Sequence, residues 1–167
     1  MEDRSKETMN DYYYVSPVGV LHIRSDAFGV CELKPMADNS FEDCCHGKPS
    51  MPDGDIGDAV RWLEVYFSGH NPQFMPRLHL VGTPFQRSVW DCLLALPYGE
   101  TITYGGLARI LGRPLSAQAV GQAVARNPVA VIVPCHRVVG SDGRLTGYAY
   151  GLEMKRRLIA MEAGIGV

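Results

Sequence analysis

The segment VIVPCHRVVG, residues 131–140, places a cysteine and a histidine side by side, directly after a run of β-branched residues and a proline. Neighbouring residues of a regular β-strand point to opposite faces, so two side chains that are adjacent in such a strand cannot cooperate. Pro134 is a reason for the strand to end. We therefore predict that residues 129–134 form a short buried strand and that Cys135 lies at its end, where functional sites are commonly built.

Cys135 and His136 form a candidate nucleophile and base. The imidazole can remove the thiol proton, directly or through a water molecule, and hold the thiolate. A carboxylate that orients the imidazole would complete the relay used by serine and cysteine nucleophiles. Three acidic residues follow the motif: Asp142, Glu153 and Glu162. A buried inert cysteine beside a structural histidine is the alternative.

At 167 residues the chain forms one domain or two small ones, and it is long enough to bury a real core. Its polar N-terminus lacks a signal region, and no apolar stretch approaches the roughly 18 residues that span a bilayer. The five cysteines are scattered without a framework spacing, which fits a reducing compartment. We expect a soluble, cytoplasmic protein without a membrane partner.

The net charge of −2 conceals an asymmetry between the two halves of the chain. Residues 1–82 carry 7 Lys or Arg and 13 Asp or Glu, a net charge of −6, whereas residues 83–167 carry 9 and 5, a net charge of +4. A basic second half suggests a polyanionic partner. A chance imbalance between two ordinary halves explains the charges equally well.

The first half has the pattern of a small antiparallel sheet and a helix. Residues 12–26 contain two β-rich runs around a Ser-Pro-Val-Gly turn, and residues 28–35 are a candidate third strand. Residues 47–57 have the composition of a loop, and residues 58–69 that of an amphipathic helix capped by Asp58. The proline-punctuated residues 70–84 form the predicted boundary between an N-terminal structural domain, 1–80, and a C-terminal domain, 83–167.

The second half has the pattern of short helices. Residues 85–100 indicate a helix that ends before Pro97. Within residues 103–128, Thr103 and Ser116 can each cap a helix, and Gly112-Arg113-Pro114 separates the two. Two short helices joined by a tight turn form a helix-turn-helix pattern, which many proteins use only for packing.

The second helix of this pair carries almost no bulk, because small residues recur along it: Ala117, Ala119, Gly121, Ala123 and Ala125. Val120 and Val124 can anchor it inward. Such a slim helix can bring its backbone close to a narrow feature of a binding partner. Close helix–helix packing is the alternative.

Residues 134–164, PCHRVVGSDGRLTGYAYGLEMKRRLIAMEAG, strongly resemble the O6-alkylguanine-DNA alkyltransferases, or methylated-DNA–protein-cysteine methyltransferases. The resemblance extends upstream through VARNPVAVIV, PYGETITYGGLA and GTPFQRSVW and covers about residues 60–164. It implies an α+β fold, with an RNase H-like N-terminal sheet and helix followed by a mostly helical winged-helix or helix-turn-helix domain that binds DNA and accepts the alkyl group.

The resemblance also implies a function. It is DNA repair by direct, irreversible, single-turnover transfer of the alkyl group from O6-alkylguanine, and also from O4-alkylthymine, to Cys135. The implied partner is double-stranded DNA, bound through the minor groove by a monomer. An alkylated base inside a stacked duplex must be flipped out before a thiolate can reach it. The slim helix suits a minor groove better than a major groove.

By that resemblance Cys135 is the alkyl acceptor, His136 is the base acting through water, and Glu162 orients the histidine. Asn127 matches the asparagine that braces the turn between the recognition helix and the active-site strand. Tyr104 matches the tyrosine that lies against the flipped base and the DNA backbone and assists the leaving guanine.

The remaining site residues also follow from the resemblance. Val138 and the Tyr148–Ala149 stretch match the pocket wall, and Ser141 matches a phosphate contact. The residues expected along the DNA-binding helix are Ala117, Gln118 and Gly121.

Two residues depart from the family pattern. Gln118 stands where the family usually has an arginine that is inserted into the base stack, and glutamine lacks the charge and planar fork of arginine. Tyr150 stands at the pocket rim where the family often has glycine, which predicts a preference for methyl over bulky adducts.

The stretch DCCHG, residues 43–47, is a weak candidate for a metal site, because zinc ligands usually stand two to four residues apart. The zinc ligands of some family members do not map cleanly onto this half of the chain. We predict no structural zinc and no cofactor.

Three other functions fit parts of the sequence. An alkyltransferase-like protein that binds lesions without repairing them would lack the cysteine, so Cys135 argues against it. A Cys-His hydrolase would explain Cys135, His136 and Glu162 but not Tyr104 and Asn127, and it would turn over repeatedly. A helix-turn-helix regulator would bind one duplex sequence specifically.

Overall fold

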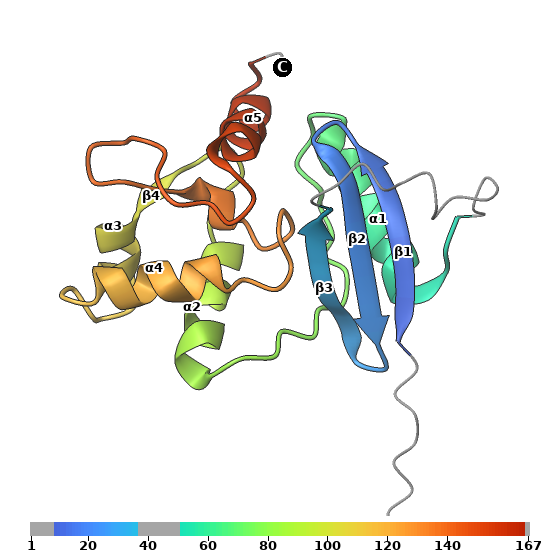
Figure 1. The fold of residues 1–167 in the computed structure, drawn as a ribbon, viewed down its shortest axis with the longest axis horizontal. Helices are drawn as coiled ribbons and strands as arrows, with labels where there is room; N and C mark the ends of the chain where they lie inside the picture. The colour runs from blue at the N-terminus through green and yellow to red at the C-terminus, as the bar shows by residue number, and fades with distance from the viewer. Residues whose placement is uncertain (1–8, 37–50, 166–167) are drawn as a thin grey trace, which may run out of the picture. The chain divides into compact units, whose positions relative to one another are not determined.

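The computed structural model describes residues 9–36 and 51–165, and the chain divides into two compact units, Met1–Leu80 and Val81–Val167 (Figure 1). In the first unit, strands β1 (Asn10–Ser16), β2 (Gly19–Asp26) and β3 (Gly29–Pro35) form an antiparallel sheet in that order. Helix α1 (Gly54–Phe67) packs against all three strands. The predicted three-stranded sheet is confirmed, whereas DCCHG lies outside the described residues.

The core of the first unit follows from the two-residue period of β2 and the helical period of α1. Leu21 and Ile23 alternate with half-buried residues along β2 and are fully buried. On the helix side, Leu63 and Tyr66 are likewise fully buried. The sheet therefore presents one apolar face to one amphipathic helix.

Helix α1 begins at Gly54, four residues before the predicted start, with Asp53 in the N-cap position. The Gly and Asp content of this segment predicted a loop, but Ile56 is buried and extends the apolar face of the helix by one turn. Asp58, the predicted cap, lies instead within the helix and pairs with Arg61.

The second unit is mostly helical, and the α+β fold class is therefore confirmed. Helix α2 (Pro84–Leu94) begins with a capping box between Thr83 and Gln86 and ends before Pro97, as predicted. Thr103 caps α3 (Tyr104–Ile110) by accepting a hydrogen bond from Gly106 N. Ser116 occupies the N-cap position of α4 (Ala117–Ala125), but its side chain makes no capping hydrogen bond.

The remaining elements of this unit are short. Strand β4 (Ile102–Thr103) pairs in parallel with β5 (Val138–Val139), and β5 directly follows the 3₁₀ turn η2 (Cys135–Arg137). Helix α5 (Leu152–Glu162) packs against η2. Among the described residues, no helix has both the length and the apolar character needed to cross a bilayer.

The predicted strand at residues 129–134 is wrong. These residues are buried, but they form consecutive turns, with hydrogen bonds from Ile132 N to the Ala130 carbonyl at 2.8 Å and from Val133 N to the Val129 carbonyl at 3.0 Å. Val131 has a φ of +69°, a left-handed conformation that is rare for a β-branched residue. The apolar run therefore indicated burial, and the strand begins only after the cysteine, at Val138.

Candidate active site

Cys135 lies at the start of η2, and only 5% of its surface is exposed. Its Sγ accepts a hydrogen bond from Asn127 Nδ2 at 3.1 Å, and the same nitrogen donates to the Val133 carbonyl at 2.8 Å. Asn127 Oδ1 accepts from the Val129 N–H at 3.0 Å. One amide group therefore holds both the irregular segment and the sulfur atom that follows it.

His136 is the middle residue of η2, which packs against α5, and it is fully buried. Its Nε2 donates a hydrogen bond to Glu162 Oε1 at 2.6 Å. Burial would raise the pKa of Glu162, but the hydrogen bonds from His136 and Arg137, together with the positive charge of Arg137, outweigh burial and lower the pKa to about 2. The structure therefore joins the predicted base to an ionised carboxylate, which fixes the ring orientation.

The resting thiol of Cys135 is protonated. Burial raises its pKa, and this effect exceeds the opposing effects of the Asn127 hydrogen bond, the Lys155 charge and the Tyr148 hydroxyl. Burial lowers the pKa of His136, so its imidazole is neutral and able to accept a proton. The site thus contains a protonated nucleophile and a neutral base on adjacent residues.

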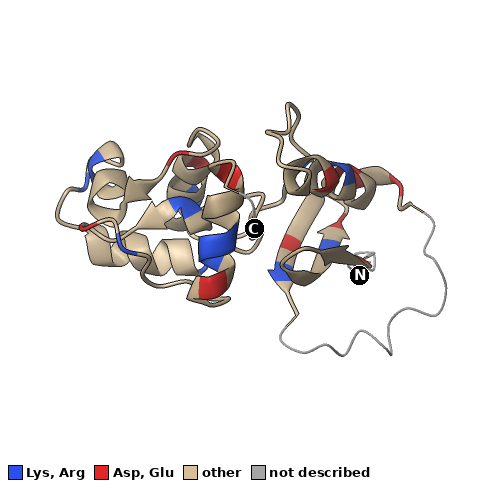
Figure 2. Ribbon diagram, turned by 90° about the horizontal axis from the view of Figure 1, so that it is seen from above, with Lys and Arg blue, Asp and Glu red and all other residues tan. Residues whose placement is uncertain are grey.

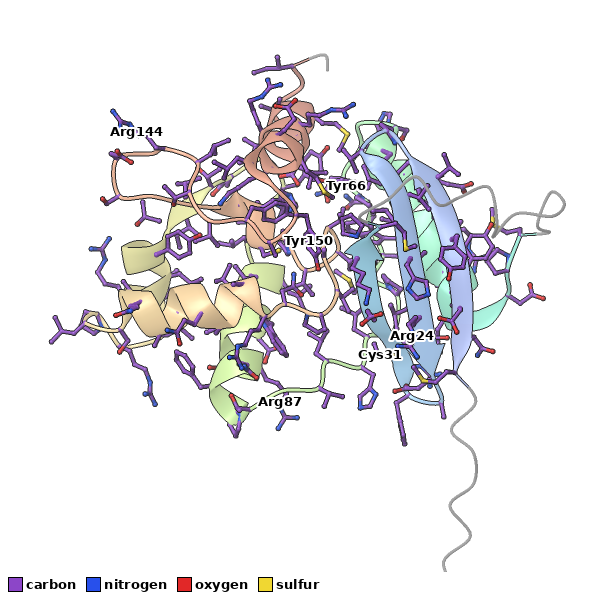
Figure 3. All side chains as sticks on the ribbon, viewed as in Figure 1. Arg24, Cys31, Tyr66, Arg87, Arg144 and Tyr150 are labelled. Carbon is purple, nitrogen blue, oxygen red and sulfur yellow. The ribbon has the colours of Figure 1, made fainter. Side chains whose placement is uncertain are left out.

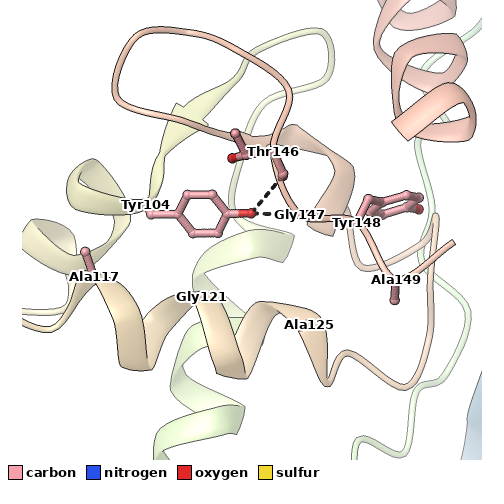
Figure 4. Close-up of a pocket in the computed structure, with 8 residues that line it drawn as sticks. All are labelled: Tyr104, Ala117, Gly121, Ala125, Thr146, Gly147, Tyr148 and Ala149. Atoms are coloured by element: carbon pink, nitrogen blue, oxygen red, sulfur yellow. Dashed lines mark hydrogen bonds between the residues drawn. The ribbon is translucent and has the colours of Figure 1, made fainter. Parts of the chain in front are cut away.

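A cavity of about 590 Å³ lies beside α4 (Figure 4). Residues one helical turn apart on α4, Ala117, Gly121 and Ala125, line one wall, and Tyr104 lines another. Three of the five small residues predicted to make this helix slim therefore face open space, whereas Ala123 is buried. The complete lining consists of Tyr104, Ala117, Gly121, Ala125, Thr146, Gly147, Tyr148 and Ala149.

A second, much smaller cavity of about 10 Å³ lies at Cys135. It shares lining residues with the large cavity, including Tyr148 and Ala149, so the two adjoin. Tyr150 also lines it and packs edge-on against Tyr148, with ring centroids 5.6 Å apart. Such a space holds about one water molecule.

Tyr104 connects α3 to the loop that forms this wall. Its hydroxyl donates to the carbonyls of Thr146 and Gly147, each at 3.3 Å (Figure 4). Burial raises the pKa of Tyr104, so the phenol keeps its proton near neutral pH. Tyr104 therefore lines the cavity beside α4 and is tied to the loop on its other side.

Three other predicted residues line neither of these two cavities. Gln118 is exposed on α4, and Ser141 is exposed in the loop after β5. Val138 is buried in β5 and lines neither cavity. Its contribution to the site is a main-chain carbonyl that accepts a hydrogen bond from Lys155.

Comparison with known proteins assigns a family to this arrangement. Residues 84–164 match the family model described as 6-O-methylguanine DNA methyltransferase, DNA binding domain. A methylated-DNA–protein-cysteine methyltransferase of Methanosarcina acetivorans is 42% identical over 159 residues, which cover 90% of this chain and 97% of the relative. The chain belongs to the methylated-DNA–protein-cysteine methyltransferase family.

Solved structures agree with this family assignment. The crystal structure of Mycobacterium tuberculosis O6-methylguanine methyltransferase has a TM-score of 0.80 and 38% identity, covering 96% of each chain. A structure of Mycobacterium tuberculosis OGT in complex with DNA has a TM-score of 0.78 and 40% identity, covering 92% of each chain. The fold and enzyme class implied by the sequence resemblance are therefore confirmed.

Sequence reasoning missed Lys155, a fully buried cation of this methyltransferase. Its Nζ donates to the carbonyls of Val138 and, at 2.8 Å, Thr146. The spacing of α5 contained a signal, because Leu158 and Glu162 stand three and seven residues after Lys155 and so share its helix face. Lys155 therefore shares a helix face with the buried Leu158 and with Glu162.

The basic residues of the second unit, blue in Figure 2, are mostly arginines, and most of these arginines are exposed. Arg87 on α2 and Arg144 in the loop after β5 point outward from different parts of this unit (Figure 3). Arg113 lies over the Phe85 ring, with its guanidinium carbon 5.3 Å from the centroid. The positive charge of the second half is therefore available to a polyanion.

Proposed function

We propose that this methyltransferase repairs DNA by transferring the alkyl group of O6-alkylguanine directly and irreversibly to Cys135. One observation carries the proposal: Cys135, whose sulfur is hydrogen-bonded to Asn127, lines a small cavity beside a slim helix, and the next residue, His136, is hydrogen-bonded to Glu162. A Cys-His hydrolase would also need Cys135, His136 and Glu162, but it would not need the slim helix α4.

The transfer is a substitution at an sp³ carbon. His136 removes the thiol proton through a water molecule, and the electron pair left on sulfur forms the S–C bond. The bond between that carbon and guanine O6 breaks, and the released guanine takes up a proton. The proposed assistant of that leaving base is the Tyr104 phenol, which keeps its proton near neutral pH.

The product sets the stoichiometry. A hydrolase that forms a thioester can be regenerated by water, whereas a thioether offers water no comparable reaction. Each molecule should therefore react once. O4-alkylthymine carries the same type of O–CH₃ bond and is a second proposed substrate.

We assign residues 83–167 as the DNA-binding and alkyl-acceptor domain. Two features of this domain favour DNA binding: its net positive charge and the shape of α4. Ala117, Gly121 and Ala125 leave its cavity face without bulk, which suits insertion into a minor groove. The alkylated base then rotates out of the stack toward the cavity. Ser141, exposed in the loop after β5, is a proposed phosphate contact.

Mass spectrometry of the intact protein and its peptides tests the proposal after mixing with duplex oligonucleotides that contain O6-methylguanine or O4-methylthymine. We expect one methyl group per protein, on the Cys135 peptide, and none in Cys135→Ser. More than one equivalent of repaired base per protein would favour a hydrolase-type cycle. Folded wild type that transfers no methyl from O6-methylguanine would refute the proposal.

A further inference from the structure

Arg137 is the last residue of η2, and its side chain is almost completely buried. Its Nε donates to Glu162 Oε2 at 2.8 Å and its Nη2 donates to Oε1 at 3.2 Å, so it contacts both oxygens of one carboxylate. Nη1 donates to the Leu96 carbonyl at 2.8 Å. This planar group therefore links α5 to the segment that follows α2.

The Glu162 carboxylate receives hydrogen bonds from three residues. His136 Nε2 and Arg137 Nη2 share Oε1, whereas Arg137 Nε and, at 3.2 Å, the Gly99 N–H share Oε2. A carboxylate offers about four lone-pair positions. These contacts use that capacity, so the imidazole interacts with an oxygen that Arg137 already partly neutralises.

Formal charges show why the His136 imidazole favours its neutral form. Arg137 and Glu162 cancel each other, so a neutral His136 leaves the group of three without net charge. A protonated His136 would add a buried positive charge near Lys155, which is already a buried cation, and uncompensated buried charge is costly. Among the described residues, the charged groups that act on His136 are Glu162, Arg137 and Lys155. Cys135 precedes it on η2, and Tyr98 lies beneath the Arg137 guanidinium.

We propose that Arg137 is a positioning residue for the transfer. Arg137 occupies both oxygens of Glu162 and thereby keeps the His136 imidazole neutral, with the imidazole proton on Nε2. This proposal rests on the proposed function. The Sγ–H bond of Cys135 breaks, its proton passes through a water molecule to Nδ1, and its electron pair stays on sulfur. Burial lowers the pKa of His136, Glu162 opposes this effect, and the Arg137 charge lowers the pKa further.

The test compares wild type with Arg137→Met and Arg137→Lys. We expect the His136 pKa, measured by ¹⁵N NMR of the imidazole, to rise by about one unit in Arg137→Met, and the acid limb of the single-turnover transfer rate to move to higher pH by the same amount. Arg137→Lys keeps the charge without the two-point contact, so its His136 pKa should fall between the other two.

Arg156→Met is the matched control, because Arg156 forms a similar two-point contact with Glu153 on the exposed face of α5. It should leave both the His136 pKa and the acid limb unchanged. An unchanged His136 pKa and acid limb in folded Arg137→Met would overturn the proposal.

Wild type alone provides a test that needs no variant to fold, because an imidazolium at position 136 at pH 7 would contradict the proposal. The two proposals can also fail separately. If wild type transfers no methyl group, the proposed function fails, whereas the NMR titration still decides whether Arg137 controls His136.

Discussion

Asn127 Nδ2 lies 3.1 Å from Cys135 Sγ and 2.8 Å from the Val133 carbonyl oxygen, so one amide group ties the nucleophile to the backbone that precedes it. The segment between them needs this tie, because it contains no strand ladder and holds Val131 at a φ of +69°. Stability and reactivity therefore depend on the same side chain.

Asn127→Ala should destabilise the protein by about 3 kcal/mol, because the Val133 carbonyl and the Val129 N–H would be buried without their partner. It should also raise the pKa of Cys135, since the hydrogen bond that favours the thiolate is lost. Urea unfolding measures the first effect, and the pH dependence of Cys135 alkylation measures the second. Asn71→Ala, at an exposed position, should change neither; equal stability of the two variants would contradict the bracing role.

The low pKa of Glu162 predicts that the protein becomes less stable in acid. This pKa is about 2 in the folded protein, compared with 4.5 for the ordinary group, so ionised Glu162 stabilises the fold above pH 4.5 and this contribution is lost as the pH falls toward 2. A difference of this size corresponds to about 3 kcal/mol. Urea unfolding between pH 5 and 2 should show this loss in wild type and in the exposed-site variant Glu153→Gln, but not in Glu162→Gln. A parallel loss in Glu162→Gln would assign it to other groups.

Local sequence signals could predict many elements of this fold, since they depend on residues close in the chain. Thr103 caps α3 because its side chain reaches a backbone N–H three residues away. The turn from β1 to β2 is equally local, with Ser16 Oγ donating to the Gly19 carbonyl. Interactions of this range leave recognisable patterns in a single sequence.

The features that sequence reasoning missed depend on distant partners. Residues 129–134 have a strand-like composition, but the Asn127 side chain takes the hydrogen bonds that a neighbouring strand would otherwise provide. Arg137 and Lys155 were likewise missed because their partners, Leu96 and Val138, are 41 and 17 residues away. The helical spacing of α5 hints at the burial of Lys155, but these hydrogen-bond partners are defined only once α5 is packed against η2.

Lys155→Met should raise the pKa of Cys135, because it removes a positive charge that favours the thiolate. An increase of about one unit is expected for the loss of a nearby opposite charge. The rate of Cys135 alkylation by iodoacetamide as a function of pH, followed on the Cys135 peptide, measures it without DNA. Lys34→Met is the control, since Lys34 pairs with Glu32 at the surface of the other unit. Identical Cys135 pKa values in wild type and Lys155→Met would exclude this electrostatic effect.

Gln118→Arg should strengthen DNA binding and speed repair, because a charged planar side chain fills the space left by a flipped base better than glutamine does. Gln118 is exposed on α4, so the substitution needs no repacking of the core. We expect about tenfold tighter binding to duplex DNA, or about 1.4 kcal/mol, with a steeper salt dependence. Fluorescence anisotropy and single-turnover repair measure both quantities. Equal affinity and equal rates in Gln118→Arg and wild type would contradict the prediction.

Tyr150 should restrict the site to small adducts. Its ring lines the cavity of about 10 Å³ at Cys135 and packs edge-on against Tyr148, so a benzyl group would have to displace it. Tyr150→Gly should therefore accelerate transfer from O6-benzylguanine at least about tenfold, the usual scale of discrimination by pocket size, and leave methyl transfer within about threefold of wild type. Tyr150→Phe keeps the ring and should behave as wild type, which separates bulk from the hydroxyl group. Rates on methyl and benzyl substrates that are already equal in wild type, with no gain in Tyr150→Gly, would show that Tyr150 does not set the substrate range.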